Sequence, residues 1–254
     1  MPVASGSRLP ICLGEATKVA GEILGGRKCY RFTVTLGART TTGDAEGTVS
    51  ERAAIPPLAR SHIEAQLARF LGPGQQIPPM YSALKRAGQP LYRLARAGMT
   101  VERAPRAIEV SQLQLLALAP HSLELEVLCS KGTYVRVLAE DIAAALNTLG
   151  HVSALRREYV EPFHGEIMHT LESLAETRAR GEDPALLPID RPLAHLPAVH
   201  LNAEQAWRVR QGQAVRVSDA PRTMRVRLQG AAGLLGIGVS DAEGVVRPRR
   251  LLNL

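Results

Sequence analysis

Residues 28–37 read KCYRFTVTLG, and this stretch gives the first indication of the fold. Apolar and polar residues alternate along it as far as Gly37, which is typical of a strand with one face on a hydrophobic core. Residues 107–118 and 122–129 predict two more strands. Strands and helices are mixed along the chain, because helical spacing of apolar residues recurs over 11–24, 58–71, 137–146 and 171–180.

Two segments depart from these regular patterns. Residues 72–105 are rich in Gly, Pro, Arg and Tyr and only weakly periodic, so they predict a long basic loop of the kind that carries function. Residues 194–254 contain short apolar runs broken by glycines, which predicts a small β-barrel-like module. We therefore expect two domains, residues 1–193 and residues 194–254.

The composition of the 254 residues is that of an ordinary globular protein, with 45% hydrophobic and 22% charged residues. This excludes a collagen-like, disordered or disulfide-stapled chain. No apolar run approaches the ~20 residues that span a bilayer, and no signal peptide opens the sequence, so we expect no membrane association. Cys12, Cys29 and Cys129 are widely spaced. We expect free thiols in a cytoplasmic protein, and no zinc site or disulfide.

The net charge of +7 favours a polyanionic partner, with nucleic acid as the first candidate. Residues 195–254 hold nine arginines and four acidic residues, so this tail carries most of the excess charge. The alternative is a genome that encodes much arginine, in which case the tail arginines form only a solvated basic surface.

Lysine occurs only four times beside 27 arginines, at Lys18, Lys28, Lys85 and Lys131. Three of the four lie within a few residues of a tyrosine. Basic residues interleaved with tyrosines suit a surface that stacks bases and holds phosphates. Each of these lysines, taken singly, is explained equally well as a solvated lysine beside a tyrosine of the core. Four together, in a chain with 4% aromatic residues, favour nucleic acid.

Residues 129–136, CSKGTYVR, lie where a strand ends and a helix begins. A glycine at this point permits a tight turn. An arginine in the place of Arg136 can hold a carboxylate bidentately and keep it ionised. The alternative is a structural arginine that pairs with Glu140 or Asp141 on the following helix. The seven histidines show no metal-ligand spacing, and Walker, Gly-x-Ser-x-Gly and Gly-x-Gly-x-x-Gly motifs are absent, so we expect no metal site.

Five motifs then carry a resemblance. They are GEATK at 14–18, KCYRFTVTLGARTTTGDAEG at 28–47, QIPPMYSALK at 76–85, CSKGTYVR at 129–136 and HVSALRR at 151–157. In this order they closely resemble the TruB-type tRNA pseudouridine-55 synthases over nearly the whole chain, and the tail looks like a PUA-type RNA-binding module. The resemblance implies an α+β fold, with a mixed, largely antiparallel sheet flanked by helices and a small C-terminal β-barrel-like PUA domain.

The resemblance also implies a substrate and a pocket. The substrate would be the T arm of tRNA, in which uridine 55 is flipped out and isomerised to pseudouridine without metal or cofactor. Tyr30 would stack in the uridine pocket, and Tyr134 would lie on the other side of the base and help to move its proton. Arg136 would pair with the catalytic aspartate, and Leu155 would line the pocket.

RNA contacts are expected outside this pocket as well. The resemblance implies that Lys18 and Lys85 touch the RNA backbone and that residues 72–105 clasp the T arm. The charge of the tail adds Arg249 and Arg250 as expected RNA contacts. We expect the protein to act as a monomer.

The first ten residues, MPVASGSRLP, depart from the family pattern. Members carry a GTLDPxASGxLP-type segment before the GEATK helix, and its aspartate is the catalyst. Met1 stands in the place of that aspartate. We therefore expect an N-terminally truncated member that lacks the nucleophilic aspartate and is inactive as written. The alternatives are a non-catalytic tRNA-binding module and a non-functional remnant.

Overall fold

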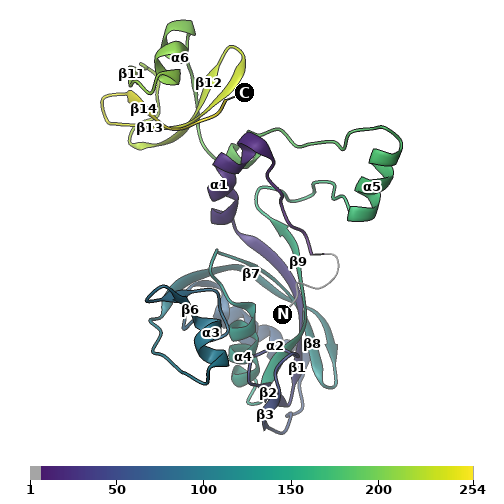
Figure 1. Cartoon of the computed structure of the whole chain (residues 1–254). Coiled ribbons are helices and arrows are strands. Elements are labelled where there is room, and N and C mark those ends of the chain that lie inside the picture. The colour runs from purple at the N-terminus through teal and green to yellow at the C-terminus, as the bar shows by residue number, and fades with distance from the viewer. Residues whose placement is uncertain (1–6, 254) are drawn as a thin grey trace. The chain divides into compact units, whose positions relative to one another are not determined.

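The computed structural model describes residues 7–253, and the chain forms two compact units (Figure 1). The first unit consists of Met1–Leu9 and Gly26–Val160, and the second of Pro10–Gly25 and Glu161–Leu254. The expected division into residues 1–193 and residues 194–254 stays a prediction. The two compact units are defined by contacts between residues, whereas the expected domains are defined by sequence motifs. The prediction that Met1 replaces an aspartate lies outside the described residues.

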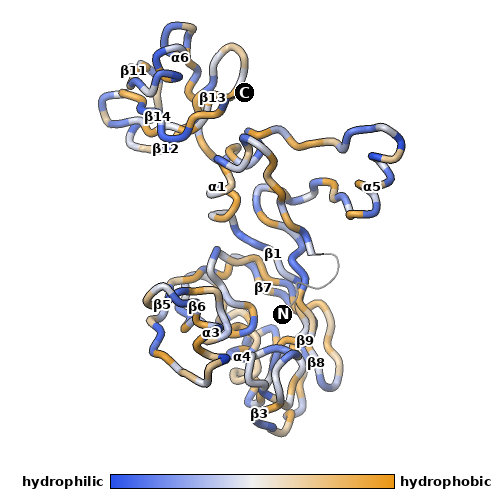
Figure 2. The backbone as a smooth tube through the Cα atoms, viewed as in Figure 1, coloured by the Kyte–Doolittle hydropathy of each residue, from blue (hydrophilic) through white to orange (hydrophobic). Residues whose placement is uncertain are grey.

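The first unit is built on a five-stranded antiparallel sheet with the strand order β4-β7-β8-β1-β9. The strands are β4 (Gly72–Gln76), β7 (Arg106–Ala119), β8 (Ser122–Cys129), β1 (Lys28–Leu36) and β9 (Gly150–Val160). Hydrophobic and hydrophilic residues alternate along much of this sheet (Figure 2). The strands predicted near 28–36, 107–118 and 122–129 are confirmed, and so is the largely antiparallel α+β fold.

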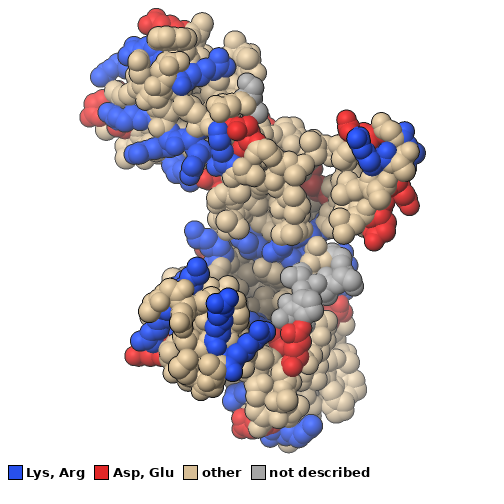
Figure 3. All heavy atoms as spheres, in the orientation of Figure 1, with Lys and Arg blue, Asp and Glu red and all other residues tan. Residues whose placement is uncertain are grey.

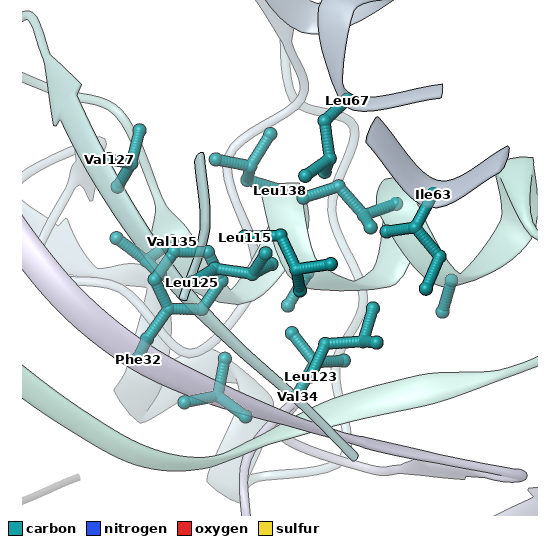
Figure 4. Close-up of a cluster of buried hydrophobic side chains, with 14 of the residues drawn as sticks. Phe32, Val34, Ile63, Leu67, Leu115, Leu123, Leu125, Val127, Val135 and Leu138 are labelled. Carbon is teal, nitrogen blue, oxygen red and sulfur yellow. The ribbon is translucent and has the colours of Figure 1, made fainter. Parts of the chain in front are cut away.

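Helices α2 (Arg60–Leu67) and α4 (Val135–Ala145) cover one face of this sheet and close the core. Figure 4 shows Phe32 from β1 and Leu125 from β8 beside Val135 and Leu138 of α4. Phe32 is 1% exposed, and the other buried residues of the cluster are between 0% and 7% exposed. Full burial of such a side chain stabilises the fold by about 1.5–3 kcal/mol. This core fixes the positions of β1 and of the first turn of α4.

The segment 72–105 is not one irregular loop. Gly72–Gln76 forms strand β4 at the edge of the sheet, in register from Gly72 opposite Val110 to Gln76 opposite Arg106. The prediction was wrong for these five residues, because GPGQQ has no apolar alternation and the strand pairs through its backbone. The remainder carries β5 (Lys85–Arg86), β6 (Gln89–Pro90) and α3 (Leu91–Arg96). We call residues 77–105 the insertion.

Smaller elements complete the first unit. Strands β2 (Ala38–Thr40) and β3 (Val49–Arg52) form an antiparallel pair that holds the loop 41–48 between them. The 3₁₀-helix η2 (Ala68–Phe70) follows α2, so the helix predicted over 58–71 is shorter than expected.

The second unit contains a sheet with the strand order β10-β12-β13-β14-β11, in which only β10 and β12 are parallel. This sheet confirms the small β-barrel-like module. The strands are β10 (Ala198–His200), β12 (Met224–Gly230), β13 (Gly233–Ser240), β14 (Val245–Leu251) and β11 (Val215–Arg216). Its helices are η1 (Gly14–Val19), α1 (Ala20–Gly25), α5 (Leu171–Ala179), η3 (Arg191–Leu193) and α6 (Ala203–Arg210).

The sequence pattern did not predict α6. This helix buries only Val209 and therefore lacks a wide apolar stripe, but Asn202 and Gln205 cap its start reciprocally. The segment Pro10–Gly25 is fixed to the C-terminal sheet by a buried apolar cluster in which Val19 packs with Ile237 and Leu252.

Candidate functional site

A cavity of about 190 Å³ lies in the first unit, at the edge of the apolar core. Three segments far apart in sequence line it, namely β1, the turn that leads into α4, and β9. Its lining residues are Tyr30, Thr133, Tyr134, Val135, Arg136 and Leu155. The structure thus brings together all four residues that the sequence assigned to one pocket.

The backbone of Tyr134 is held by the side chain of Gln76. The Tyr134 N–H donates to Gln76 Oε1 over 2.9 Å, and Gln76 Nε2 donates to the Tyr134 carbonyl over 3.4 Å. Tyr134 precedes the first residue of α4, and its own side chain does not cap the helix. Gln76 is 4% exposed and ends β4, where the insertion begins. The side-chain amide of Gln76 therefore fixes Tyr134 relative to the start of the insertion.

Replacing Gln76 by Leu is expected to lower the free energy of unfolding of the first unit by about 1–3 kcal/mol, because the Tyr134 N–H and carbonyl lose their partners. Urea unfolding monitored by tyrosine emission measures this, since all five tyrosines lie in the first unit and the single tryptophan, Trp207, lies in the second. The neighbouring Gln75 is exposed, so Gln75→Leu serves as the matched control and should change stability by less than about 0.5 kcal/mol. Equal effects of the two substitutions would refute the positioning role of Gln76.

Arg136 is fixed by three acceptors. Its Nη1 donates to Asp44 Oδ2 over 3.1 Å and to the Thr42 carbonyl over 3.0 Å, and its Nη2 donates to the Tyr81 carbonyl over 2.6 Å. The side chains of Arg136 and Asp44 are 18% and 1% exposed, so this is a largely buried ion pair. The alternative that Arg136 pairs with Glu140 or Asp141 is wrong, because the loop 41–48 brings Asp44 within reach instead.

The loop 41–48 is shaped to present this carboxylate. Asp44 Oδ1 accepts hydrogen bonds from Thr42 Oγ1 over 2.6 Å and from the Glu46 N–H over 3.1 Å, which is an Asx turn. Gly43 has a φ of +73°, and a Cβ there would lie 3.0 Å from a carboxylate oxygen of Glu140. Glycine therefore lets the loop approach α4 closely enough for Asp44 to reach Arg136.

Positive charges lie close to the cavity. Burial lowers the pKa of Lys28, and the neighbouring charges of Arg157 and Lys131 lower it further. Burial also raises the pKa of Tyr30, so its phenol stays neutral. On α4, burial raises the pKa of both Glu140 and Asp141. The cavity thus joins two phenol rings and a leucine with an arginine whose charge Asp44 balances.

The four residues expected to contact RNA fall into two places. Lys85 is exposed in β5 of the insertion. Lys18, Arg249 and Arg250 line one cavity of the second unit. Lys18 also has an internal role, because its Nζ donates to the Leu251 carbonyl over 3.1 Å and pairs with Glu15 Oε2 at 2.7 Å.

Sequence reasoning missed two residues that shape the site. Gln76 and Asp44 entered only as members of the motifs at 76–85 and 28–47. Both are buried polar side chains whose partners lie 58 and 92 positions away. A polar residue in an irregular segment gives no signal of such a distant partner, so the three-dimensional structure is needed to find it.

Within residues 7–253 no helix is long and apolar enough to cross a membrane. The same residues include no group of three or more His, Cys, Asp or Glu side chains that could hold a metal ion.

Family descriptions match along almost the whole sequence. "TruB family pseudouridylate synthase (N terminal domain)" matches residues 2–135 and "tRNA pseudouridylate synthase B C-terminal domain" matches residues 136–194. "Pseudouridine synthase II TruB, C-terminal" matches residues 197–252.

Two relatives, both named tRNA pseudouridine synthase B, are similar over nearly the full chain. The protein of Chromohalobacter salexigens is 46% identical over 254 residues, which are 99% of this chain and 82% of the relative. The protein of Nitrosococcus oceani is 47% identical over 255 residues, with the same two coverages.

Solved structures share the fold. A chain in the crystal structure of a Cbf5-Nop10-Gar1 complex matches with a TM-score of 0.70 and 21% identity, over 94% of this chain and 70% of that one. A chain in the structure of an H/ACA RNP bound to a substrate RNA containing 2′-deoxyuridine matches with a TM-score of 0.68 and 18% identity, over 95% and 71%. With its sequence matched by the family descriptions from residue 2 to residue 252, the chain belongs to the TruB family of pseudouridine synthases, which are isomerases.

Proposed function

We propose that the cavity at Tyr30, Tyr134, Arg136 and Leu155 binds a uridine extruded from the T loop of tRNA, at position 55. One observation carries the proposal: Tyr30 from β1 meets Tyr134 and Arg136 from the start of α4 in one small cavity. Its volume of about 190 Å³ lies below the ~300–1,000 Å³ of pockets for drug-sized ligands, and suits a single base. The names of the curated relatives support tRNA as the source of this base.

Three of these pocket residues then have a direct role toward the base. Tyr30 and Tyr134 offer aromatic faces on which the extruded base stacks, and stacking offsets part of the cost of taking it out of the loop. Leu155 closes the apolar wall of the cavity. The RNA backbone is held by cations, for which we propose Lys18, Lys85, Arg249 and Arg250, while the insertion clasps the T arm.

Catalysis needs one more group. The family reaction cleaves the N1–C1′ bond, turns the uracil and forms the C5–C1′ bond, with the help of an aspartate. Among residues 7–253 no carboxylate lines the cavity, and the nearby Asp44 is engaged by Arg136, Thr42 and Glu46. We therefore propose that the chain as given binds the T arm and does not isomerise the uridine.

Binding of a T-arm stem–loop RNA tests the base pocket. Tyr134→Ala is expected to weaken binding by about 1–3 kcal/mol, which is roughly 5- to 150-fold, because one stacking face is removed. Tyr134→Phe keeps that face and serves as the matched control, with an affinity close to that of the parent chain. The proposal fails if the T arm binds no more tightly than an unrelated hairpin, or if Tyr134→Ala binds as tightly as Tyr134→Phe.

A further inference from the structure

The second unit contains its own cavity, of about 490 Å³, which lies between the segment 10–25 and the C-terminal sheet. One wall comes from η1 and α1, and the other from β12, β13 and β14. The lining residues are Thr17, Lys18, Gly21, Glu22, Arg225, Ile237, Arg249 and Arg250. Figure 3 shows Lys and Arg side chains gathered over this sheet, with acidic side chains next to them.

The four cations of this cavity differ in their partners. Lys18 is paired with Glu15, and Arg225 is paired with Glu22. Arg249 and Arg250 are exposed, and within residues 7–253 neither makes an ion pair or a side-chain hydrogen bond. The cavity therefore has two arginines with free donors and a third whose donors are occupied by a carboxylate of the same chain.

Glu22 occupies Arg225 in the geometry that arginine uses for phosphate. Both Arg225 nitrogens contact it: Nη1 donates to Glu22 Oε2 over 3.0 Å, and Nη2 donates to Glu22 Oε1. This two-pronged contact is the one by which a guanidinium binds a phosphate group. The Glu22 side chain is 12% exposed, and His195 Nε2 lies 3.6 Å from its Oε2. Of the described residues that line the cavity, Glu22 is the acidic one.

We propose that this cavity binds a phosphodiester of the RNA backbone, and that Glu22 is an internal competitor that holds Arg225 until a phosphate replaces it. The proposal rests on the proposed function, since the RNA must first bind. Free donors on Arg249 and Arg250 attract the phosphate, and Arg225 then exchanges one anion for another. The displaced Glu22 carboxylate repels the incoming phosphate and therefore lowers the affinity for RNA. An RNA backbone that the rest of the protein holds weakly does not overcome this repulsion.

The decisive variant is Glu22→Gln, because it predicts a gain. Removing the competing charge is expected to tighten T-arm binding by about two- to tenfold and to steepen the dependence of log K on log salt by about one unit. Misfolding cannot imitate a gain in affinity. Glu204→Gln is the matched control, since Glu204 is an exposed acid of α6 in the same unit and its removal changes the net charge equally.

Two further variants locate the effect. When Arg225→Met is also present, Glu22→Gln should bind the T arm no more tightly than Glu204→Gln does, because Glu22 then has no arginine to hold. Arg249→Ala with Arg250→Ala should flatten the salt slope by about one unit for each phosphate that the arginines no longer neutralise. Inorganic phosphate and AMP are also titrated as competitors of T-arm binding. A site for the RNA backbone is expected to give only weak competition. Displacement of the RNA by an equal concentration of AMP would instead indicate a site for a free nucleotide.

The outcomes separate the two proposals. If Glu22→Gln binds the T arm no more tightly than Glu204→Gln, or more weakly, the competitor role is overturned and Glu22 instead orients Arg225. The proposed function survives that result as long as Tyr134→Ala weakens binding. If Arg249→Ala with Arg250→Ala leaves the salt slope unchanged, or if AMP displaces the RNA at equal concentration, the assignment of this cavity to the RNA backbone is overturned.

Discussion

Incubated with unmodified tRNA, the 254-residue chain is expected to form no detectable pseudouridine. The family reaction depends on an aspartate, and within residues 7–253 the cavity lining contains no carboxylate. A group that acts in the transition state cannot be replaced by binding energy alone. Loss of such a group lowers rates by about 10⁴- to 10⁶-fold in enzymes where it has been removed. Release of tritium from uridine labelled at C5 measures the reaction directly.

The related protein of Chromohalobacter salexigens provides the positive control, assayed with the same tRNA and the same buffer. The 254-residue chain should bind that tRNA but leave the label in place. Turnover within about tenfold of the control would contradict the proposal, and would direct attention to Asp44 as the aspartate paired with Arg136.

The second large effect concerns the buried pair of Asp44 and Arg136. Asp44→Ala is expected to lower the free energy of unfolding of the first unit by about 3–5 kcal/mol, because a largely buried guanidinium loses its carboxylate. Two hydrogen bonds inside the loop 41–48 are removed with it. Urea unfolding monitored by tyrosine emission gives the change for the first unit, while Trp207 emission should stay at its parental midpoint.

An exposed ion pair of the same unit supplies the comparison. Arg39 and Glu51 pair at 3.2 Å with side chains 44% and 58% exposed, so Glu51→Ala should cost less than about 1 kcal/mol. The double variant Asp44→Asn with Arg136→Met should be less destabilised than the sum of its single variants, because each single variant leaves a buried group without its partner. Additive effects would show that the two side chains do not interact energetically.

Much of the sheet could be predicted from the sequence, because its inner strands bury one face. In β1, Phe32 and Val34 alternate with polar residues, and the structure buries both. Strand β4 could not be predicted, since its GPGQQ residues pair through the backbone at a sheet edge and bury only Gln76. Helix α6 was missed for a similar reason, because capping rather than an apolar stripe defines it.

The candidate site was predictable as a set of residues but not as a network. Tyr30, Tyr134, Arg136 and Leu155 were identified through motif resemblance, and the structure places all four around one cavity. The groups that hold them were not identified. Gln76 reaches Tyr134 only because β4 pairs with β7 at the sheet edge. A sequence pattern predicts on which face of its own strand or helix a residue lies. Contacts between distant segments depend on how the strands and helices pack together, which the pattern does not describe.

We expect an extruded uridine to enter the cavity between Tyr30 and Tyr134. Photo-cross-linking measures this with a T-arm stem–loop RNA that carries 5-iodouridine at the target position, followed by peptide mapping of the adduct. Attachment is expected at Tyr30 or Tyr134, and it should be suppressed by excess unmodified T-arm RNA but not by an unrelated hairpin. Attachment confined to Tyr81 or Tyr92 of the insertion, or to the second unit, would show that the base does not enter this cavity.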